Sequence, residues 1–241
     1  MARFLGVKSR QAQKEAGPED LSARLITLSD PTGLASEAYR TLRTNLLYGL
    51  LDNPPKVIVV TSPGPGEGKS TTCANLGVVL AQANRSILIL DCDLRRPAVH
   101  KVFGLRNKIG ITDVLARERT LEEVWKEPVE GLKVVCVGPI PPNPADTIGS
   151  LRFAELLASV REEFDYVLLD ASPIGIVSDP AILATQGDGV LLIVDAQQTR
   201  KGAVRQAVRS LKAVDARVLG TVMNNVKATE GGRYYGYTYK Y

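Results

Sequence analysis

Four short stretches of the chain are continuously apolar. They cover residues 57–60, 87–90, 167–169 and 190–194. A strand that is buried on both faces, as in a parallel sheet covered by helices, has such a run, whereas a half-exposed strand alternates apolar and polar positions. We therefore predict strands over the ranges 57–61, 86–90, 132–137, 166–170, 189–194 and 217–222.

Helical patterns fill the segments between these runs. Over residues 35–51, leucines recur at every fourth position, and two prolines after Asn53 end the helix. Strands that alternate with helices indicate an α/β fold, a doubly wound domain around a mostly parallel sheet. We predict further helices over the ranges 69–83, 111–116, 120–126, 147–163, 180–185 and 200–214.

The two ends of the chain differ in composition from its middle. Residues 1–20 are polar and basic, and we expect a flexible arm there. Residues 228–241 form a tyrosine-rich tail, and residues 21–227 between them form one predicted domain. With 44% hydrophobic and 23% charged residues, the chain of 241 residues has the composition of a globular protein, which excludes disorder of the whole.

Charge and cysteine content narrow the classes of function. The net charge of +4 is small for a nucleic-acid binder, so we expect no nucleic-acid partner. Three cysteines without metal-ligand spacing are typical neither of a disulfide framework nor of a metal centre. The apolar runs are far shorter than the ~20 residues of a membrane-spanning helix, and the first residues lack a signal-peptide pattern. We therefore expect a cytoplasmic protein.

A glycine-rich loop joins the first predicted strand to the helix that follows. Glycines let successive backbone N–H groups point at a phosphate, a lysine neutralises the β/γ-phosphates, and a serine hydroxyl ligates Mg²⁺. Pro63 stands where the strict pattern has glycine, and a Gly/Pro-rich turn is the alternative interpretation. The strand before the loop and the helix after it favour a nucleotide site. The loop residues are Gly64, Pro65, Gly66, Glu67, Gly68, Lys69, Ser70 and Thr71.

Three aspartates follow predicted strands and are expected at one edge of the sheet. Asp91 and Asp93 end one strand, and Asp170 ends another. Ligands of open α/β sheets bind beyond the carboxyl ends of the strands, which is also where the glycine-rich loop lies. Mg²⁺ with a nucleotide needs one or two carboxylates, which leaves one aspartate to orient or deprotonate an attacking group. The alternative interpretation is structural, because a lone aspartate at a strand end is more often a helix cap or a turn residue.

Together these segments, from about residue 20 to 227, resemble the bacterial tyrosine kinases (BY-kinases) of capsule and exopolysaccharide synthesis, within the wider MinD/ParA-like group of P-loop proteins. Asp91, Asp93 and Arg95 match the family's Asp-x-Asp-x-Arg (Walker A′) motif, and Asp170 with Pro173 matches its Walker B motif. The segments 138–144 and 164–166 are also similar. The resemblance implies a kinase that transfers phosphate from ATP to protein tyrosine, with ATP and Mg²⁺ as cofactors.

The resemblance also implies a role for each site residue. Lys69 would stabilise the charge of the transferring group. Ser70, Asp93 and Asp170 would organise Mg²⁺, and Asp91 would orient or deprotonate the incoming tyrosine.

In P-loop proteins of this group, an asparagine at the position of Asn224 contacts adenine. The adjacent Asn225 is an alternative for that role, and a simple turn residue is another.

A charged triplet on the first predicted helix is matched by the family as well. Glu37, Arg40 and Arg43 lie three residues apart, which places them on neighbouring turns. A solvated charged face is the ordinary interpretation of such a triplet. The family's Glu-x-x-Arg-x-x-Arg motif is a subunit interface, which implies a ring-like homo-oligomer.

The tyrosine cluster resembles the family's autophosphorylation site. Alternate spacing of four of the tyrosines also fits a terminal β-strand with one aromatic face. Because three glycines loosen the segment, we favour a flexible tail that is phosphorylated in trans by a neighbouring subunit. The cluster consists of Tyr234, Tyr235, Tyr237, Tyr239 and Tyr241.

Partners and alternatives follow from the same resemblance. It implies a separate transmembrane activator or polysaccharide co-polymerase that recruits the chain to the inner face of the cell membrane, and a cognate tyrosine phosphatase. The alternative is a membrane-recruited ATPase switch of MinD/ParA type, which carries a second lysine at the position of Gly64. That lysine is absent here. A regulatory subunit without chemistry is a third hypothesis, against which the three aspartates argue.

Overall fold

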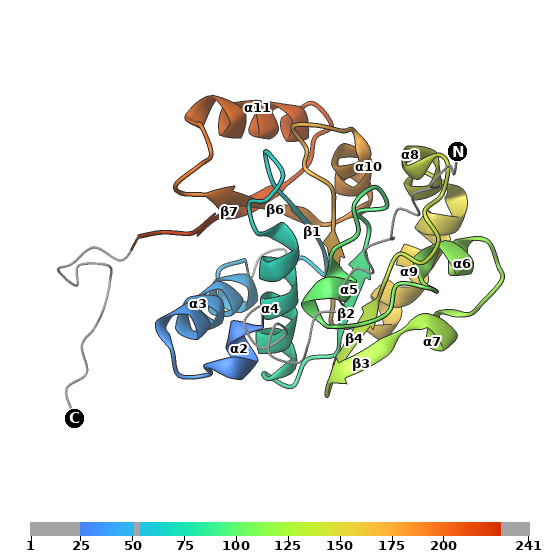
Figure 1. Cartoon of the computed structure of the whole chain (residues 1–241). Helices are drawn as coiled ribbons and strands as arrows, with labels where there is room; N and C mark the ends of the chain where they lie inside the picture. Colours follow the sequence, from blue (N-terminus) through green and yellow to red (C-terminus); the bar gives the residue numbers. More distant parts are fainter. Residues whose placement is uncertain (1–24, 51–53, 228–241) are drawn as a thin grey trace, which may run out of the picture.

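A seven-stranded sheet forms the centre of the computed structural model, which describes residues 25–50 and 54–227 (Figure 1). The strand order is β3-β4-β2-β5-β1-β6-β7, and neighbouring strands are parallel except for the antiparallel pair β3–β4. The predicted arm, 1–20, and the tail, 228–241, lie outside the described residues. The strands are β1 (Val57–Thr61), β2 (Ile87–Asp91), β3 (Lys126–Val129), β4 (Leu132–Val135), β5 (Tyr166–Asp170), β6 (Gly189–Asp195) and β7 (Val218–Asn224).

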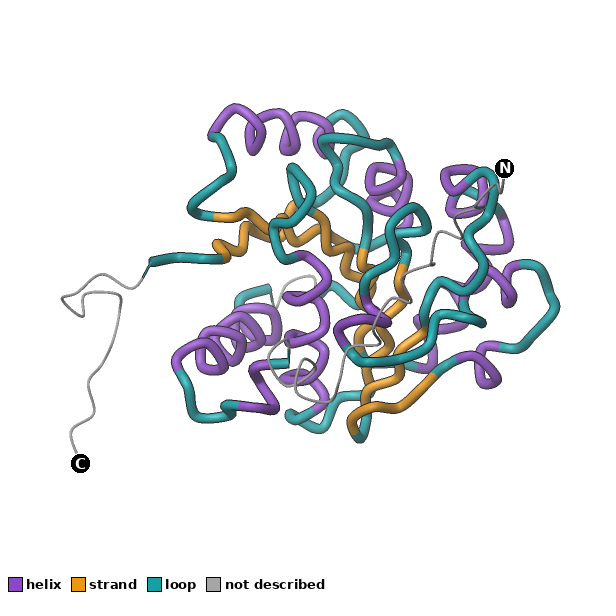
Figure 2. The backbone as a smooth tube through the Cα atoms, viewed as in Figure 1, coloured by secondary structure: helices purple, strands orange, loops and turns teal. Residues whose placement is uncertain are grey.

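Helices cover both faces of this sheet, as Figure 2 shows. On one face, Ile58 and Val60 of β1 pack with α4, which is buried along nearly its whole length. On the other face, Val57 and Val59 pack in one cluster with side chains of α9, α10 and α11. The helices are α2 (Ile26–Ser29), α3 (Leu34–Tyr48), α4 (Lys69–Ala81), α5 (Val99–Val102), α6 (Ile111–Leu115), α7 (Leu121–Val124), α8 (Pro144–Ile148), α9 (Leu151–Glu163), α10 (Asp179–Gln186) and α11 (Lys201–Lys212).

The doubly wound α/β fold predicted from the sequence is confirmed, and the differences are local. The predicted helix over 147–163 is two helices, because Ser150 accepts a hydrogen bond from the Phe153 N–H and so begins α9 anew. The short helices α2 and α5 were not predicted. Strand β3 was also missed, since it is an exposed edge strand that contains Pro128 and has no apolar run.

The carboxyl ends of the central strands meet at one edge, and this edge positions the site. Asp91 at the end of β2 lies directly opposite Asp170 at the end of β5. Asp170 in turn lies opposite Val60 of β1, just before the glycine-rich loop begins. The expectation that strand ends would bring the aspartates to this loop is therefore confirmed for these two positions.

Two smaller expectations concern cysteines and membrane spans. Within the described ranges, Cys73, Cys92 and Cys136 are buried and free. In the same part of the chain, no helix combines the length and the apolar character that crossing a membrane requires.

Candidate active site

The glycine-rich loop turns sharply between β1 and α4. Gly66 and Gly68 have φ angles of +76° and +90°, in the region that residues with a side chain rarely adopt. A Cβ atom on Gly68 would lie 2.1 Å from Nδ2 of Asn224, so the position also lacks space. The loop then leads directly into the N-terminus of α4, where helix N–H groups favour an anion.

Lys69, the first residue of α4, points into a group of carboxylates. Its Nζ lies 2.9 Å from Oδ2 of Asp93 and 3.6 Å from Oδ1 of Asp170. The same Nζ lies 3.3 Å from the Ser70 hydroxyl. Burial disfavours the charged lysine, but the attraction of Asp170 and Asp93 outweighs it and raises the pKa of Lys69. Lys69 therefore carries its charge at neutral pH.

Asp170 is completely buried, and neither of its carboxylate oxygens has a hydrogen-bond partner in the described structure. Burial raises the pKa of Asp170, and the charge of Lys69 opposes this rise. A buried carboxylate whose neighbouring cation, Lys69, is 3.6 Å away and whose oxygens lack well-formed hydrogen bonds is costly, which favours a ligand at this position. A divalent cation held by Asp170 and the Ser70 hydroxyl, directly or through water, would satisfy it.

The described residues contain no group of three or more His, Cys, Asp or Glu side chains that could hold a metal ion alone. Mg²⁺ commonly takes one or two carboxylates together with water and substrate phosphates. Ser70 and Asp170 fit an ion that arrives with a nucleotide, while Asp93, the third expected donor, pairs with Lys69 at 2.9 Å.

Asp91 and Asp93 have different surroundings, although they are only two residues apart. Asp91 is fully buried, and its oxygens accept hydrogen bonds from the N–H groups of Asp93, Ala98 and Val99. Burial, followed by the charge of Asp170, raises the pKa of Asp91 well above its usual value. Asp93 is also buried but lines the cavity. Its Oδ1 accepts hydrogen bonds from the Arg96 N–H and the Ser172 hydroxyl, and its Oδ2 pairs with Lys69.

The cavity beside the loop has a volume of about 480 Å³, which is within the range of small-molecule sites. Three cationic side chains, Lys69, Arg96 and Lys101, line it together with one carboxylate, Asp93. This charge suits a polyphosphate. The remaining lining residues are Pro65, Gly66, Gly68, Ser70, Thr71, Ala98, Val102 and Pro173.

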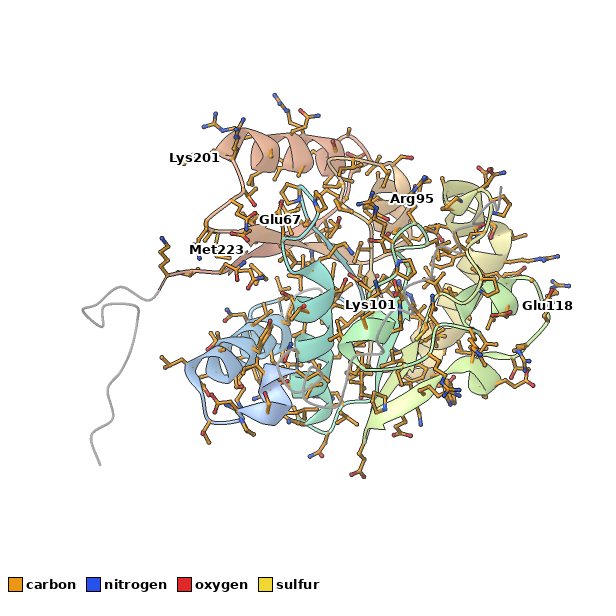
Figure 3. All side chains as sticks on the ribbon, viewed as in Figure 1. Glu67, Arg95, Lys101, Glu118, Lys201 and Met223 are labelled. Atoms are coloured by element: carbon orange, nitrogen blue, oxygen red, sulfur yellow. The ribbon has the colours of Figure 1, made fainter. Side chains whose placement is uncertain are left out.

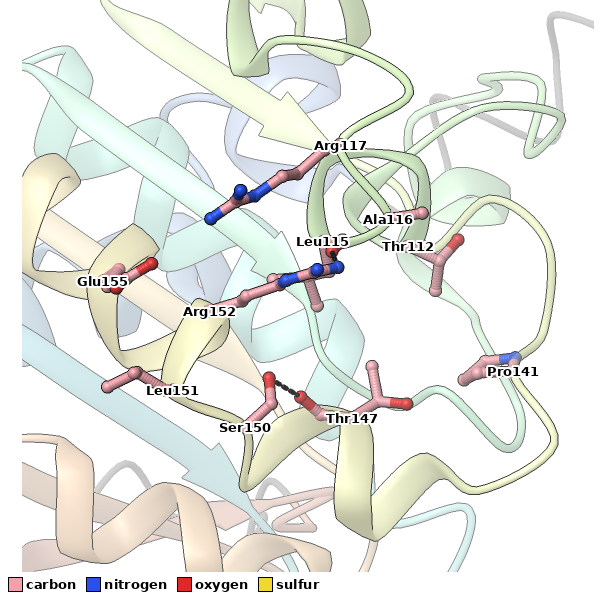
Figure 4. Close-up of a pocket in the computed structure, with 10 residues that line it drawn as sticks. All are labelled: Thr112, Leu115, Ala116, Arg117, Pro141, Thr147, Ser150, Leu151, Arg152 and Glu155. Atoms are coloured by element: carbon pink, nitrogen blue, oxygen red, sulfur yellow. Dashed lines mark hydrogen bonds between the residues drawn. The ribbon is translucent and has the colours of Figure 1, made fainter.

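A second cavity, of about 620 Å³, lies between α6, α8 and α9 (Figure 4). It shares no residue with the first cavity, and of its two arginines, Arg117 and Arg152, the second donates a hydrogen bond to the Leu115 carbonyl. None of the predicted site residues lines it. We therefore assign nucleotide chemistry to the smaller cavity.

Sequence reasoning missed the contacts that hold the loop from behind. Glu67 does not line the cavity; its Oε1 accepts a hydrogen bond from the Gly64 N–H and its Oε2 one from the Asp195 N–H. Asn224 donates from Nδ2 to the Glu67 carbonyl oxygen at 3.1 Å, and Asn225 donates from Nδ2 to Asp195. Asn224 thus connects the end of β7 to the loop, and Asn225 connects it to the end of β6. The position of Asp195 at the end of a buried strand is the signal that could have found it.

Arg95, the arginine of the Walker A′ match, forms a bidentate ion pair with Asp179 of α10. Its Nε and Nη2 donate to the two carboxylate oxygens of Asp179, at 2.7 and 3.0 Å, and Asp179 is fully buried at the start of α10. The pair connects the loop after β2 to the segment after β5. The bidentate contact holds these two segments together, although the Arg95 side chain itself is partly exposed.

The triplet on α3 lies apart from the cavity. Glu37 and Arg40 form an ion pair of 2.9 Å on the helix surface, and Arg40 also donates to the Pro31 carbonyl. Arg43 donates from Nη1 to the Val79 carbonyl of α4 at 3.0 Å. Arg43 therefore attaches α3 to its own domain, while most of the Glu37 side chain faces solvent.

Comparisons with known proteins match this chain to P-loop NTPases and to bacterial tyrosine-protein kinases. The ParA family, described as NUBPL iron-transfer P-loop NTPase, matches residues 53–232. Tyrosine-protein kinase YwqD of Bacillus subtilis is 38% identical over 215 residues, which is 89% of this chain and 91% of YwqD. The putative tyrosine-protein kinase CapB of Staphylococcus aureus is 33% identical, over 86% of this chain and 91% of CapB.

Solved structures separate the kinase interpretation from the ATPase switch. The crystal structure of the chimerical protein CapA2B2 is 34% identical with a TM-score of 0.82, covering 86% of this chain and 91% of that one. The cell division ATPase MinD of Pyrococcus furiosus is 26% identical with a TM-score of 0.58, over 70% of this chain and 71% of that one. Likeness to the kinases is thus greater in sequence, in structure and in coverage. The chain belongs to the bacterial tyrosine-protein kinases, a branch of the ParA-like P-loop NTPases.

Proposed function

We propose that this chain is an ATP-dependent autokinase that phosphorylates the tyrosine cluster of its own C-terminal segment. The observation that carries the proposal is the buried Asp170, whose carboxylate accepts no hydrogen bond and lies beside Lys69 and Ser70 at the phosphate loop. This donor set fits a metal-bound nucleotide. The cluster Tyr234, Tyr235, Tyr237, Tyr239 and Tyr241 supplies the acceptor hydroxyls.

In the proposed reaction, a tyrosine hydroxyl oxygen attacks the γ-phosphorus of ATP. The new Oη–P bond forms as the bond from the γ-phosphorus to the bridging oxygen breaks, and ADP leaves. Tyrosine has an ordinary pKa of about 10, so a carboxylate must orient the hydroxyl or accept its proton. We assign this role to Asp93, which lines the cavity, rather than to the fully buried Asp91.

The other site residues hold and stabilise the phosphates. The N–H groups of the loop and Lys69 neutralise charge on the transferring group, while Asp91 fixes the backbone that carries Asp93 through its bond to the Asp93 N–H. Mg²⁺, bound through Ser70 and Asp170, would supply further neutralisation of the phosphate oxygens. Asn224, whose Nδ2 donates to the Glu67 carbonyl of the loop, is the proposed contact to the base.

Substitution of Lys69 tests this function. In Lys69→Met we expect no labelled phosphotyrosine after incubation with radiolabelled MgATP, because the charge at the phosphate site is lost and little volume changes. Circular dichroism should show a folded protein. The matched control is Lys108→Met, an exposed lysine outside the cavity, which should label like the wild type. Phosphotyrosine retained in Lys69→Met would overturn the assignment of the site.

We further propose that the kinase works as a ring-like homo-oligomer in capsular or exopolysaccharide synthesis. A separate transmembrane activator would recruit it to the inner face of the membrane, and a cognate phosphatase would reverse the modification. Support comes from the named CapB relative and from the putative tyrosine-protein kinase EpsB of Ralstonia nicotianae, of which this chain matches only 30%. The labelling experiment, repeated with the candidate activator, tests whether activity depends on it.

A further inference from the structure

Helix α11 presents a row of cations to solvent at the edge of the molecule. We call the set Arg200, Lys201, Arg205, Arg209 and Lys212 the α11 basic face; all five residues are exposed. Members spaced four apart lie on one side of a helix, while the opposite side packs Ala207 and Leu211 into the core. In Figure 3, nitrogen-tipped side chains project from α11 away from the sheet, and Lys201 lies at its first turn.

Few acidic side chains lie near these charges along the chain; the exposed Asp215 follows Lys212 by three residues. Residues 196–214 contain no Asp or Glu. In the described part of the chain, no member of the α11 basic face forms an ion pair; Arg209 donates a hydrogen bond to the uncharged Gln206. Five like charges over a few turns repel one another, so an anionic partner would be favourable there.

The end of β7, from which the chain continues to the C-terminal segment, contacts the residues just before α11. The Ala196 N–H donates to the Asn224 carbonyl at 2.8 Å, and Nε2 of Gln197 donates to the Asn225 carbonyl at 2.7 Å. Arg200 follows Gln197 by three residues. The last described residues before the tail therefore lie beside the segment that leads into α11.

The tail is long enough to cover the whole face. Twelve helical residues span about 18 Å. Fourteen tail residues reach roughly 45–50 Å when extended, and a flexible chain of that length averages about 20 Å. Because the two segments belong to one chain, their effective concentration is in the millimolar range.

Phosphorylation would reverse the sign of the tail. Its side chains carry one acidic group, Glu230, and two basic groups, Arg233 and Lys240, so the side-chain charge of the unmodified tail is only +1. Each phosphotyrosine adds about −1.5 to −2 charges at neutral pH. The unmodified tail therefore has no electrostatic attraction to the α11 basic face, whereas the phosphorylated tail is attracted to it.

We propose that the α11 basic face binds the phosphorylated tail of this chain and so withdraws the product from the active site. This inference rests on the proposed autokinase function. It adds a product-binding surface outside the catalytic cavity. The same anionic chemistry occurs on a lipid surface, but the tail is favoured because the residues before it lie beside the segment that leads into α11 and because its charge changes sign on modification.

The test uses a synthetic peptide of residues 228–241 with all five tyrosines phosphorylated and a fluorescent label. It is titrated with a chain truncated after Lys227, by anisotropy, so the result does not depend on kinase activity. We expect binding that weakens with salt and that saturating MgADP leaves unchanged. The triple variant Arg205→Gln/Arg209→Gln/Lys212→Gln should bind at least tenfold more weakly. The unphosphorylated peptide should bind at least tenfold more weakly as well.

A matched control removes the same charge elsewhere. Arg106→Gln/Lys108→Gln/Arg119→Gln changes three exposed cations outside α11 and should retain wild-type binding. Equal affinity of the α11 triple variant and the wild type, or loss of binding in MgADP, would overturn the proposal. So would an affinity for phosphatidylserine vesicles that depends on the α11 residues, found without any phosphopeptide binding. Absence of autophosphorylation with phosphopeptide binding intact would instead contradict only the proposed function.

Discussion

At Gly68 the backbone has a φ of +90°, and a methyl group there would lie 2.1 Å from Nδ2 of Asn224. Two costs therefore coincide at this residue. A side chain disfavours the left-handed conformation by about 1–2 kcal/mol, and the Asn224 amide would have to leave its bond to the Glu67 carbonyl. The residue lies where the phosphate loop becomes α4, so both costs act on the nucleotide site.

We expect Gly68→Ala to lower nucleotide affinity at least tenfold and stability by about 1–3 kcal/mol, measured with a fluorescent ATP analogue and by urea unfolding. Gly202→Ala is the control, because Gly202 lies in α11, has open space around it and lacks a positive φ. That variant should keep its affinity and gain about 0.5–1 kcal/mol. Unchanged nucleotide affinity in Gly68→Ala would show that the loop does not cradle phosphates.

At the scale of elements, the carboxylate of Asp188 links β1, β6 and α9 at the edge of the sheet where the parallel strands begin. Asp188, just before β6, accepts hydrogen bonds from the N–H groups of Lys56 and Val57 at the start of β1. It also accepts from Nη1 of Arg161 in α9 at 2.8 Å. Burial acts to raise the pKa of Asp188, but these bonds and the arginine lower it below its usual value.

The sign of the pH dependence follows from that lowered pKa. The folded state holds the carboxylate ionised, so the contribution of Asp188 is fully present above its unfolded pKa of about 4 and is lost as the pH falls through the folded pKa. We expect Asp188→Asn to lower the free energy of unfolding by about 1–2 kcal/mol at pH 7. The difference from wild type should shrink below pH 4.

Urea unfolding of both proteins at pH 7, 5 and 3 checks this expectation. Glu162→Gln, an exposed acid on α9, should change stability by less than about 0.5 kcal/mol at each pH. A difference between Asp188→Asn and wild type that grows as the pH falls would show that the sign is wrong.

Helix α3 offers a test of assembly. Because Arg43 bonds to Val79 within its own domain, the informative variant keeps it and changes only Glu37→Ala/Arg40→Ala. We expect loss of the proposed oligomer in light scattering, with nucleotide affinity and fold retained. The control is Glu118→Ala/Arg119→Ala, an exposed pair of the same charges. An unchanged mass of the α3 variant would contradict the interface hypothesis and show that Glu37 and Arg40 lie on an ordinary solvated helix face.

At the scale of the whole molecule, β7 ends at the same edge as the phosphate loop, so the tail begins near its own active site. Its extended reach of roughly 45–50 Å also covers a neighbouring subunit. Length alone therefore does not decide between transfer in cis and in trans. A tail directed at its own site must reverse sharply, whereas a ring would present it to the next subunit.

We accordingly expect transfer in trans that depends on oligomerisation. The experiment mixes Lys69→Met, which retains the tail, with an active chain truncated after Lys227, and maps phosphotyrosine on the inactive partner. Lys69→Met alone is the control and should stay unlabelled. Labelling of wild type at every dilution, with no labelling of the inactive partner in the mixture, would show that transfer is in cis.

Much of this architecture could be predicted from the sequence, because buried strands and phosphate loops are local patterns. The apolar runs specified four central strands, and the glycines with Lys69 and Ser70 specified the loop between β1 and α4. Since parallel strands share a carboxyl edge, the sequence alone was enough to bring Asp91 and Asp170 together.

Only the tertiary structure decided which groups contact one another across the chain. Arg95 binds Asp179 across 84 residues, and the Asp195 N–H binds Glu67 across 128, pairings that no periodicity encodes. The fold also decided that Asp91 accepts hydrogen bonds from backbone N–H groups away from the cavity, while Asp93 lines the cavity and pairs with Lys69. Spacing in a sequence records which side of an element is buried, whereas the partner of a buried polar group depends on how distant elements pack.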